Sequence, residues 1–126
     1  EKLKEEFEQY RNVRVIGKVD ELSPWYLNAQ YIIAPIFEGS GMKTKVAEAF
    51  MFGKKILATR SALAGYDNLP EYSYYLCNTS KEYIDTIESL VDSNYSNFDE
   101  NIRNIYEKKF SLSSSQTILS SILMGK

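Results

Sequence analysis

The chain has 126 residues, of which 44% are hydrophobic and 25% are charged, as is ordinary for one soluble globular domain with a buried core. Fifteen basic residues against 17 acidic ones give a net charge of -2, so the charge offers no case for binding nucleic acid or more than peripheral contact with a membrane. Histidine is absent and Cys77 is the one cysteine, which excludes an intrachain disulfide, a multi-cysteine metal site and any Ser-His or Cys-His nucleophile pair within the chain. No apolar run reaches the roughly 18 residues needed to span a bilayer, and the acidic start is unlike a secretory signal, so we expect a cytoplasmic protein.

The opening of the chain predicts one helix and one strand. Leu3, Phe7 and Tyr10 recur at helical spacing and predict a short amphipathic helix that packs through this face. The β-rich run at residues 13–16 predicts the first strand, which ends at Gly17. Because the chain begins inside a charged amphipathic pattern without an initiator Met, we expect it to be part of a longer protein.

A second helix is predicted to begin near residue 23. Ser23 is expected as its N-cap and Pro24 as its first helical residue. Trp25 and Tyr26 lie on this helix, and we expect both in the core rather than stacked on bases, because no basic patch surrounds them.

Three further strands follow. The continuous apolar run at 31–34 predicts a strand covered on both faces, and Pro35 ends its ladder. Gly53 stands where the left-handed cap of the next helix belongs. Residues 56–58 and 72–77 predict the last two strands, and Cys77 is interpreted as a small core residue.

The second half of the chain is predicted to be helical. Thr79 and Glu82 form a capping box before an apolar helical pattern, and a C-terminal helical segment is expected over 92–126. The alternation of strands and helices predicts a single domain over 1–126 of the α/β class, with a Rossmann-like, mostly parallel sheet of about four strands and helices on both faces.

The stretch from residue 35 to residue 53 has the pattern of an anion site. A strand ends, a loop with Gly39 and Gly41 follows, and a helix starts with Lys43 and Lys45 in its first turn. Lysines near a helix start are electrostatically unfavourable there, and a bound phosphate resolves the conflict. Ser40 can donate a further hydrogen bond, although glycines at such a turn also serve tight geometry alone.

Glu48 lies on the helix face shared with Thr44 and Lys45. Its side chain leans toward the helix N-terminus and can therefore accept the two vicinal hydroxyls of a ribose. The alternative is an intrahelical ion pair between Lys45 and Glu48.

Residues 17–22 (GKVDEL) and 31–59 (YIIAPIFEGSGMKTKVAEAFMFGKKILAT) resemble the donor-binding C-terminal domain of group 1 glycosyltransferases, two-domain GT-B enzymes that transfer a sugar from a nucleotide-sugar. The resemblance covers roughly residues 12–77. It implies that Glu38 contacts the donor sugar as the catalytic glutamate and that Glu48 binds the ribose. The residues implied to hold the diphosphate are those of the loop and helix start, namely Gly39, Ser40, Gly41, Met42, Lys43, Thr44 and Lys45.

The sequence departs from the family in two ways. Glu38 and Glu48 stand ten residues apart, whereas they are closer together in most members, so the loop is longer here. The acceptor-binding domain and the first two strands of the donor domain have no counterpart in this chain. By resemblance, the missing strands lie between those matching 13–16 and 31–34, so an open edge is expected at Ile32 and Ile33, where a homodimer or a strand exchange can form.

The function expected from this resemblance is the donor-binding part of a retaining glycosyltransferase, which moves a hexosyl group from a nucleotide-sugar to a glycan or lipid-linked acceptor. No cofactor and no protein-bound metal are expected, and the chain alone is expected to be inactive. The alternative is a non-catalytic Rossmann-like module for nucleotide binding or assembly. Ser61, Gly65 and Tyr66, in the loop after the strand at 56–58, are weaker candidates that either flank the donor site or serve the turn alone.

Overall fold

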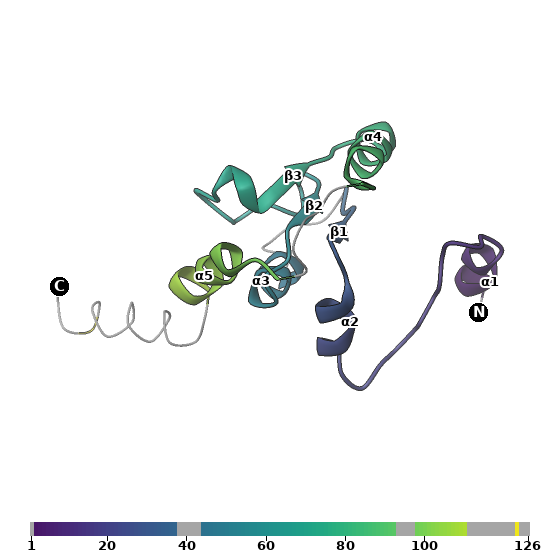
Figure 1. Ribbon diagram of the computed structural model, residues 1–126, viewed down its shortest axis with the longest axis horizontal. Helices are drawn as coiled ribbons and strands as arrows, with labels where there is room; N and C mark the ends of the chain where they lie inside the picture. Colours follow the sequence, from purple (N-terminus) through teal and green to yellow (C-terminus); the bar gives the residue numbers. More distant parts are fainter. Residues whose placement is uncertain (1, 38–43, 93–97, 111–122, 124–126) are drawn as a thin grey trace.

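The computed structural model describes residues 2–37, 44–92, 98–110 and 123 of the chain (Figure 1). Helices and strands alternate through the middle of the chain, and helices close its second half. In chain order the elements are α1 (Lys2–Glu8), α2 (Ser23–Asn28), β1 (Ile32–Ala34), α3 (Thr44–Met51), β2 (Ile56–Ala58), the 3-10 helix η1 (Glu71–Ser73), β3 (Tyr74–Leu76), α4 (Ser80–Leu90) and α5 (Glu100–Lys109).

A parallel sheet with the order β1-β2-β3 forms the centre of the molecule. Its register pairs Ile32 with Ile56 and Ile56 with Tyr74. The predicted Rossmann-like α/β class is confirmed, although the described residues form three strands rather than about four. The last strand is shorter than predicted because residues 71–73 turn into a 3-10 helix.

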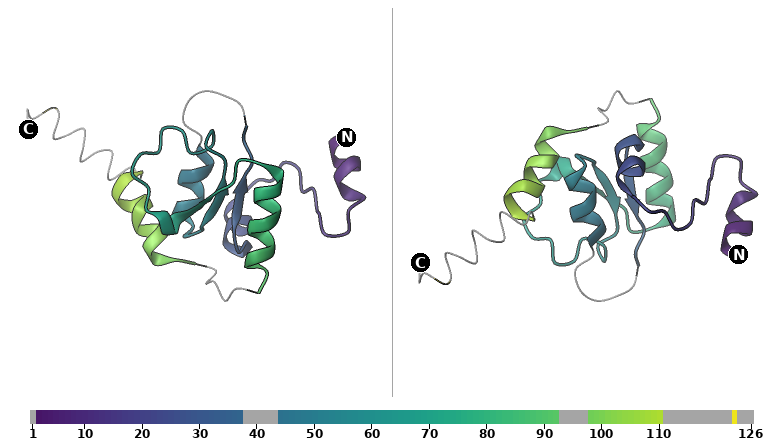
Figure 2. Two further views of the ribbon diagram at one scale, coloured as in Figure 1. Left: turned by 90° about the horizontal axis from the view of Figure 1, so that it is seen from above. Right: turned by 90° about the horizontal axis from the view of Figure 1, so that it is seen from below.

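Helices cover both faces of the sheet, as predicted (Figure 2). Alternate residues of β2 point to opposite faces, as strand geometry requires. Ile56 and Ala58 join the core with α2, α3 and α5, whereas Leu57 packs with Cys77 and Tyr83 beneath α4. The burial of Cys77 confirms it as a core residue.

The predictions for the first 20 residues were wrong in two respects. Residues 13–16 form no strand, and Val13 and Ile16 are 40% and 38% exposed. No strand in the described part of the chain lies beside them, so their backbone groups gain nothing from an extended ladder. Helix α1 lies apart from the sheet (Figure 1), and its expected packing face is exposed, with Phe7 at 42% and Tyr10, which follows the helix, at 57%.

Helix α2 begins one residue earlier than predicted. Leu22 is its N-cap, and Ser23 is already helical and makes no side-chain cap hydrogen bond. Pro24 still stands in the first turn, where a missing N–H costs nothing. Tyr26 is buried as predicted, but Trp25 is 44% exposed, so its expected core role was wrong.

The predictions for the start of α4 and the end of α3 are confirmed. Glu82 donates its backbone N–H to the Thr79 hydroxyl at 3.1 Å, which confirms the predicted cap of α4. Gly53 has a φ of 65° and ends α3 in the left-handed conformation, also as predicted.

Candidate functional site

The carboxyl ends of all three strands meet at one edge of the sheet, and the loops that leave them are tied to one another. The Thr59 hydroxyl donates to the carbonyl of Ile36 and accepts from the Ala62 N–H at 3.1 Å. The Ser61 hydroxyl donates to the carbonyl of Phe37 at 3.2 Å. The backbone is therefore fixed up to residue 37, where the loop that carries the predicted diphosphate residues departs.

A third loop joins this arrangement. The backbone N–H of Arg60 donates to the side-chain oxygen of Asn78 at 2.8 Å, which links the residues after β2 to those after β3. Arg60 is exposed at this edge and adds a cation that the sequence reasoning did not single out. The rule that ligands bind beyond the carboxyl ends of parallel strands could have identified it.

The predicted site divides into a described part and a part outside the described residues. Glu38, Gly39, Ser40, Gly41, Met42 and Lys43 lie outside the described residues. Thr44 and Lys45 are exposed in the first turn of α3, which contains no acidic residue. The opposite face of α3 is buried through Val46, Ala49 and Phe50, as the helical pattern predicted.

The Glu48 carboxylate contacts two side chains through one of its oxygens. The Tyr26 hydroxyl donates to Oε2 at 2.8 Å, and the Lys45 ammonium lies 3.6 Å from the same oxygen. The ion pair that was the alternative interpretation of Glu48 is thus present. It is half exposed, with the Lys45 side chain at 53% and that of Glu48 at 32%, so it contributes at most a few tenths of a kcal/mol, roughly the value for such helical pairs.

Tyr26 has a second role that the sequence reasoning missed. It is 7% exposed, and its ring stacks on Phe52 with centroids 5.1 Å apart and planes at 18°. Burial, followed by the hydrogen bond to Glu48, raises the pKa of the Tyr26 phenol above its usual range, so the hydroxyl remains a proton donor. A tyrosine rather than a phenylalanine at a core position signals a buried partner for the hydroxyl.

A cavity of about 240 Å³ lies beside Glu48 between α2 and α3. Apolar side chains form most of its wall, and Glu48 and the Tyr26 phenol supply polar groups. Its lining residues are Leu22, Ser23, Tyr26, Glu48, Met51 and Phe52.

The weaker candidates in the loop after β2 serve the fold. Tyr66 is 7% exposed, and its hydroxyl accepts the backbone N–H of Ala47 at 3.3 Å, which ties this loop to α3. Burial raises the pKa of the Tyr66 phenol. Gly65 has a φ of 90°, which only glycine adopts without strain, so its role is in the turn.

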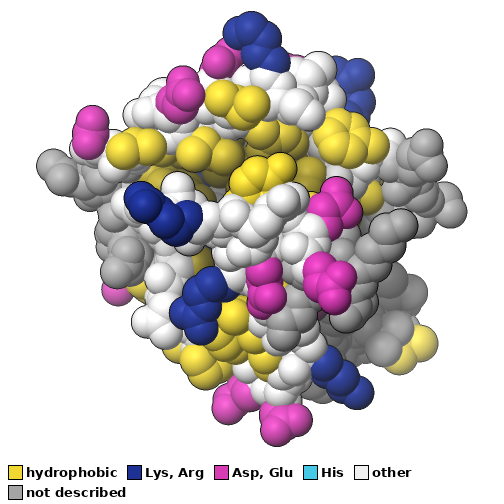
Figure 3. Space-filling model, turned by 90° about the vertical axis from the view of Figure 1, so that its right-hand side faces the viewer, with side chains coloured by type: hydrophobic (Ala, Val, Ile, Leu, Met, Phe, Trp, Pro, Cys, Tyr) yellow, Lys and Arg dark blue, Asp and Glu magenta, His cyan; other side chains and the backbone are white. Residues whose placement is uncertain are grey.

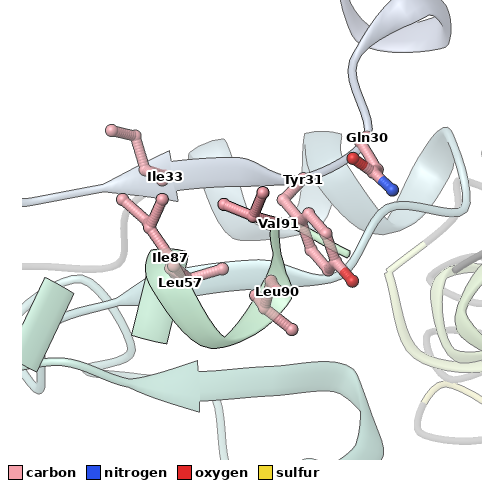
Figure 4. A pocket seen from close by; sticks show the side chains of 7 residues that line it. All are labelled: Gln30, Tyr31, Ile33, Leu57, Ile87, Leu90 and Val91. Carbon is pink, nitrogen blue, oxygen red and sulfur yellow. The ribbon is translucent and has the colours of Figure 1, made fainter. Parts of the chain in front are cut away.

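A second cavity, of about 190 Å³, lies on the other face of the sheet between β1 and α4 (Figure 4). Its wall is mostly apolar, and none of its lining residues is charged. The side chains that form it are those of Gln30, Tyr31, Ile33, Leu57, Ile87, Leu90 and Val91. This cavity therefore belongs to the packing between the sheet and α4 rather than to the Glu48 site.

The parallel sheet, with loops joined at its carboxyl edge and a helix start that carries lysine, defines an α/β protein of the Rossmann-like class. Over residues 1–93 the sequence matches the family described as Glycosyl transferases group 1. The chain belongs to the group 1 glycosyltransferases, as its resemblance implied, and this supports a role in glycosyl transfer. No curated protein and no solved structure matches it significantly. In the described part of the chain, no helix has the length and apolar character to cross a membrane.

Proposed function

We propose that this chain is the donor-binding part of a cytoplasmic glycosyltransferase that transfers a hexosyl group from a nucleotide-sugar to a glycan or lipid-linked acceptor, with retention of configuration. The observation that carries the proposal is the position of Glu48, one turn into the helix that follows β1 and beside a cavity. Membership of the group 1 family supports the reaction class.

The proposed chemistry is stabilisation of a diphosphate leaving group. Negative charge grows on the diphosphate as the glycosidic bond breaks, and the part of the family motif that holds this group corresponds in the sequence to Lys43 and Lys45. In this proposal Glu38 contacts the donor sugar, and no protein-bound metal is required because lysines and backbone N–H groups supply the positive charge.

The ribose is proposed to bind Glu48. No hydrogen bond within the described residues uses Glu48 Oε1, since Tyr26 and Lys45 both approach Oε2. A carboxylate has about four acceptor positions, so those two contacts leave room for two vicinal hydroxyls. These residues are proposed to supply donor binding alone, with transfer requiring an acceptor-binding domain.

We also propose that the chain self-associates through β1. Within the described residues β1 has a hydrogen-bonded neighbour on one side, and Ile33 on this edge strand is 54% exposed. Such an edge presents unpaired N–H and C=O groups to a second chain.

Calorimetry of the native protein with UDP, GDP and ADP tests the donor site. We expect one of the three to bind, and Glu48→Ala to weaken it about 10- to 100-fold, since hydrogen bonds to a charged group contribute about 1.5–3 kcal/mol. Glu88→Ala, which removes an exposed glutamate of α4, is the matched control and should leave binding unchanged.

Two results would count against the proposal. Absence of binding by all three diphosphates would remove the donor site altogether. In a longer protein that also contains an acceptor-binding domain, binding without any transfer or hydrolysis of the corresponding nucleotide-sugar would instead favour the non-catalytic module.

A further inference from the structure

We infer that Tyr26 is a positioning residue, which fixes the orientation of the Glu48 carboxylate and thereby prepares it to accept the ribose hydroxyls. The inference rests on the proposed donor site. It assigns a role to helix α2, which lies outside the loop and helix of the family motif.

The contact joins two helices that are far apart in the sequence. Tyr26 comes from α2 and Glu48 from α3, and the hydroxyl-to-carboxylate distance of 2.8 Å is that of a strong charge-assisted hydrogen bond. Because the Tyr26 ring is buried and stacked on Phe52, the hydroxyl has little freedom to move away.

Helix α2 is itself anchored to the end of α3. Lys54, fully buried just after α3, donates to the carbonyl of Leu27 at 3.1 Å and to that of Ala29 at 2.8 Å. These two bonds satisfy carbonyls at the C-terminal end of α2, which otherwise lack helical partners. The hydroxyl of Tyr26 is therefore held in place by packing on one side and by a buried cation at the end of its helix.

The other described neighbour of the carboxylate cannot fix it in the same way. Lys45 approaches Oε2 at 3.6 Å from a half-exposed, flexible side chain, which is beyond hydrogen-bond length. Without the Tyr26 hydroxyl, the Glu48 side chain would be free to rotate toward Lys45. A ligand would then have to order the carboxylate on binding, which weakens its affinity.

The test uses Tyr26→Phe in the native protein, because this change keeps the stacked ring and removes the hydroxyl alone. UDP, GDP and ADP and their 2′-deoxy analogues are titrated by calorimetry. We expect the ribonucleotide that binds to lose about 5- to 20-fold in affinity, less than in Glu48→Ala because the carboxylate remains and loses only its orientation, and its 2′-deoxy analogue to lose much less. In a Glu48→Ala background, Tyr26→Phe should have no further effect.

Tyr83→Phe is the matched control, since Tyr83 is 8% exposed and its hydroxyl donates to the carbonyl of Leu57 at 3.3 Å on the other face of the sheet. It should leave both affinities unchanged. Equal losses of ribo- and deoxyribonucleotide affinity in Tyr26→Phe, or additive losses with Glu48→Ala, would show a merely structural tyrosine and overturn the inference. If Tyr26→Phe binds unchanged while Glu48→Ala weakens binding, the inference is overturned and the donor site is still supported. Absence of binding by the wild-type protein would overturn both the inference and the donor site.

Discussion

Lys54 illustrates how a single side chain sets the geometry of the site from outside it. Its ammonium is fully buried, and burial lowers its pKa from the usual value. The cost of this burial is offset by the two carbonyls at the end of α2, which accept its hydrogen bonds. Lys54 therefore connects the turn after α3 to the helix that carries Tyr26.

Lys54→Met should destabilise the fold by about 1–3 kcal/mol, because it removes the charged donor of two partly buried hydrogen bonds to the carbonyls of Leu27 and Ala29. Urea unfolding measures the change. Lys81→Met is the control: the Lys81 side chain is 84% exposed and pairs with Asp85 across one helical turn, so its loss should cost less than about 0.5 kcal/mol. Equal costs for the two variants would contradict the anchoring role of Lys54.

For single residues, the sequence predicted well which side chains face the core. It did not predict which side chains contact one another between elements. The helical period placed Val46 and Phe50 inside and Glu48 at the site edge. The contact between Tyr26 and Glu48 joins positions 22 residues apart and depends on how α2 packs on α3. Periodicity carries no information about such packing.

The turn from α3 into β2 leaves little room for a side chain at Gly53. Gly53 adopts a φ of 65°, and its carbonyl accepts the N–H of Asp99 at 2.9 Å. A Cβ at this position would lie 2.9 Å from a ring carbon of Phe98 and 3.0 Å from the backbone nitrogen of Asp99. The start of α5 is thus packed directly against the end of α3.

Gly53→Ala is expected to destabilise the fold by about 2–4 kcal/mol, which combines the left-handed backbone cost with overpacking against α5. The thermal or urea unfolding transition reports this change. Gly17→Ala provides the comparison, because Gly17 has a φ of 77° but a Cβ added there would meet no atom within 4 Å, so it should cost only the left-handed backbone energy of about 1–2 kcal/mol. If Gly53→Ala were as mild as Gly17→Ala, the close contact with α5 would be wrong.

The elements that the sequence predicted correctly are those with local signals. The cap at Thr79, the glycine at the end of α3 and the apolar strand β2 each depend on neighbouring residues. Residues 13–16 have the composition of a strand, yet a strand also requires a partner that composition cannot supply. The sequence therefore predicts the fold class and overestimates the number of strands among the described residues.

For the whole molecule, the feature that bears on association is the group of exposed apolar side chains around the edge strand β1. Figure 3 views the molecule from the right-hand side of Figure 1, and hydrophobic side chains gather in a band across the upper part of this face. Ile33 of β1 and Val91, just after α4, are 54% and 69% exposed, and both line the apolar cavity between the sheet and α4. An edge strand next to exposed apolar side chains favours association.

Light scattering is expected to give the mass of a dimer for the 126-residue chain, and Ile33→Lys is expected to shift it toward the monomer by placing a charge at the β1 edge. Leu76→Lys is the control on the opposite edge strand, where Leu76 is 43% exposed, and it should leave the mass unchanged. A monomer mass that does not vary with concentration would contradict this proposal and leave the donor site untouched.

A crystal structure of the native protein with the nucleoside diphosphate that binds it tests the central claim most directly. The account predicts the ribose hydroxyls against the Glu48 carboxylate, the Tyr26 hydroxyl still bonded to that carboxylate, and the diphosphate at the N-terminal end of α3. A nucleotide bound elsewhere, or one bound with its ribose turned away from Glu48, would contradict it.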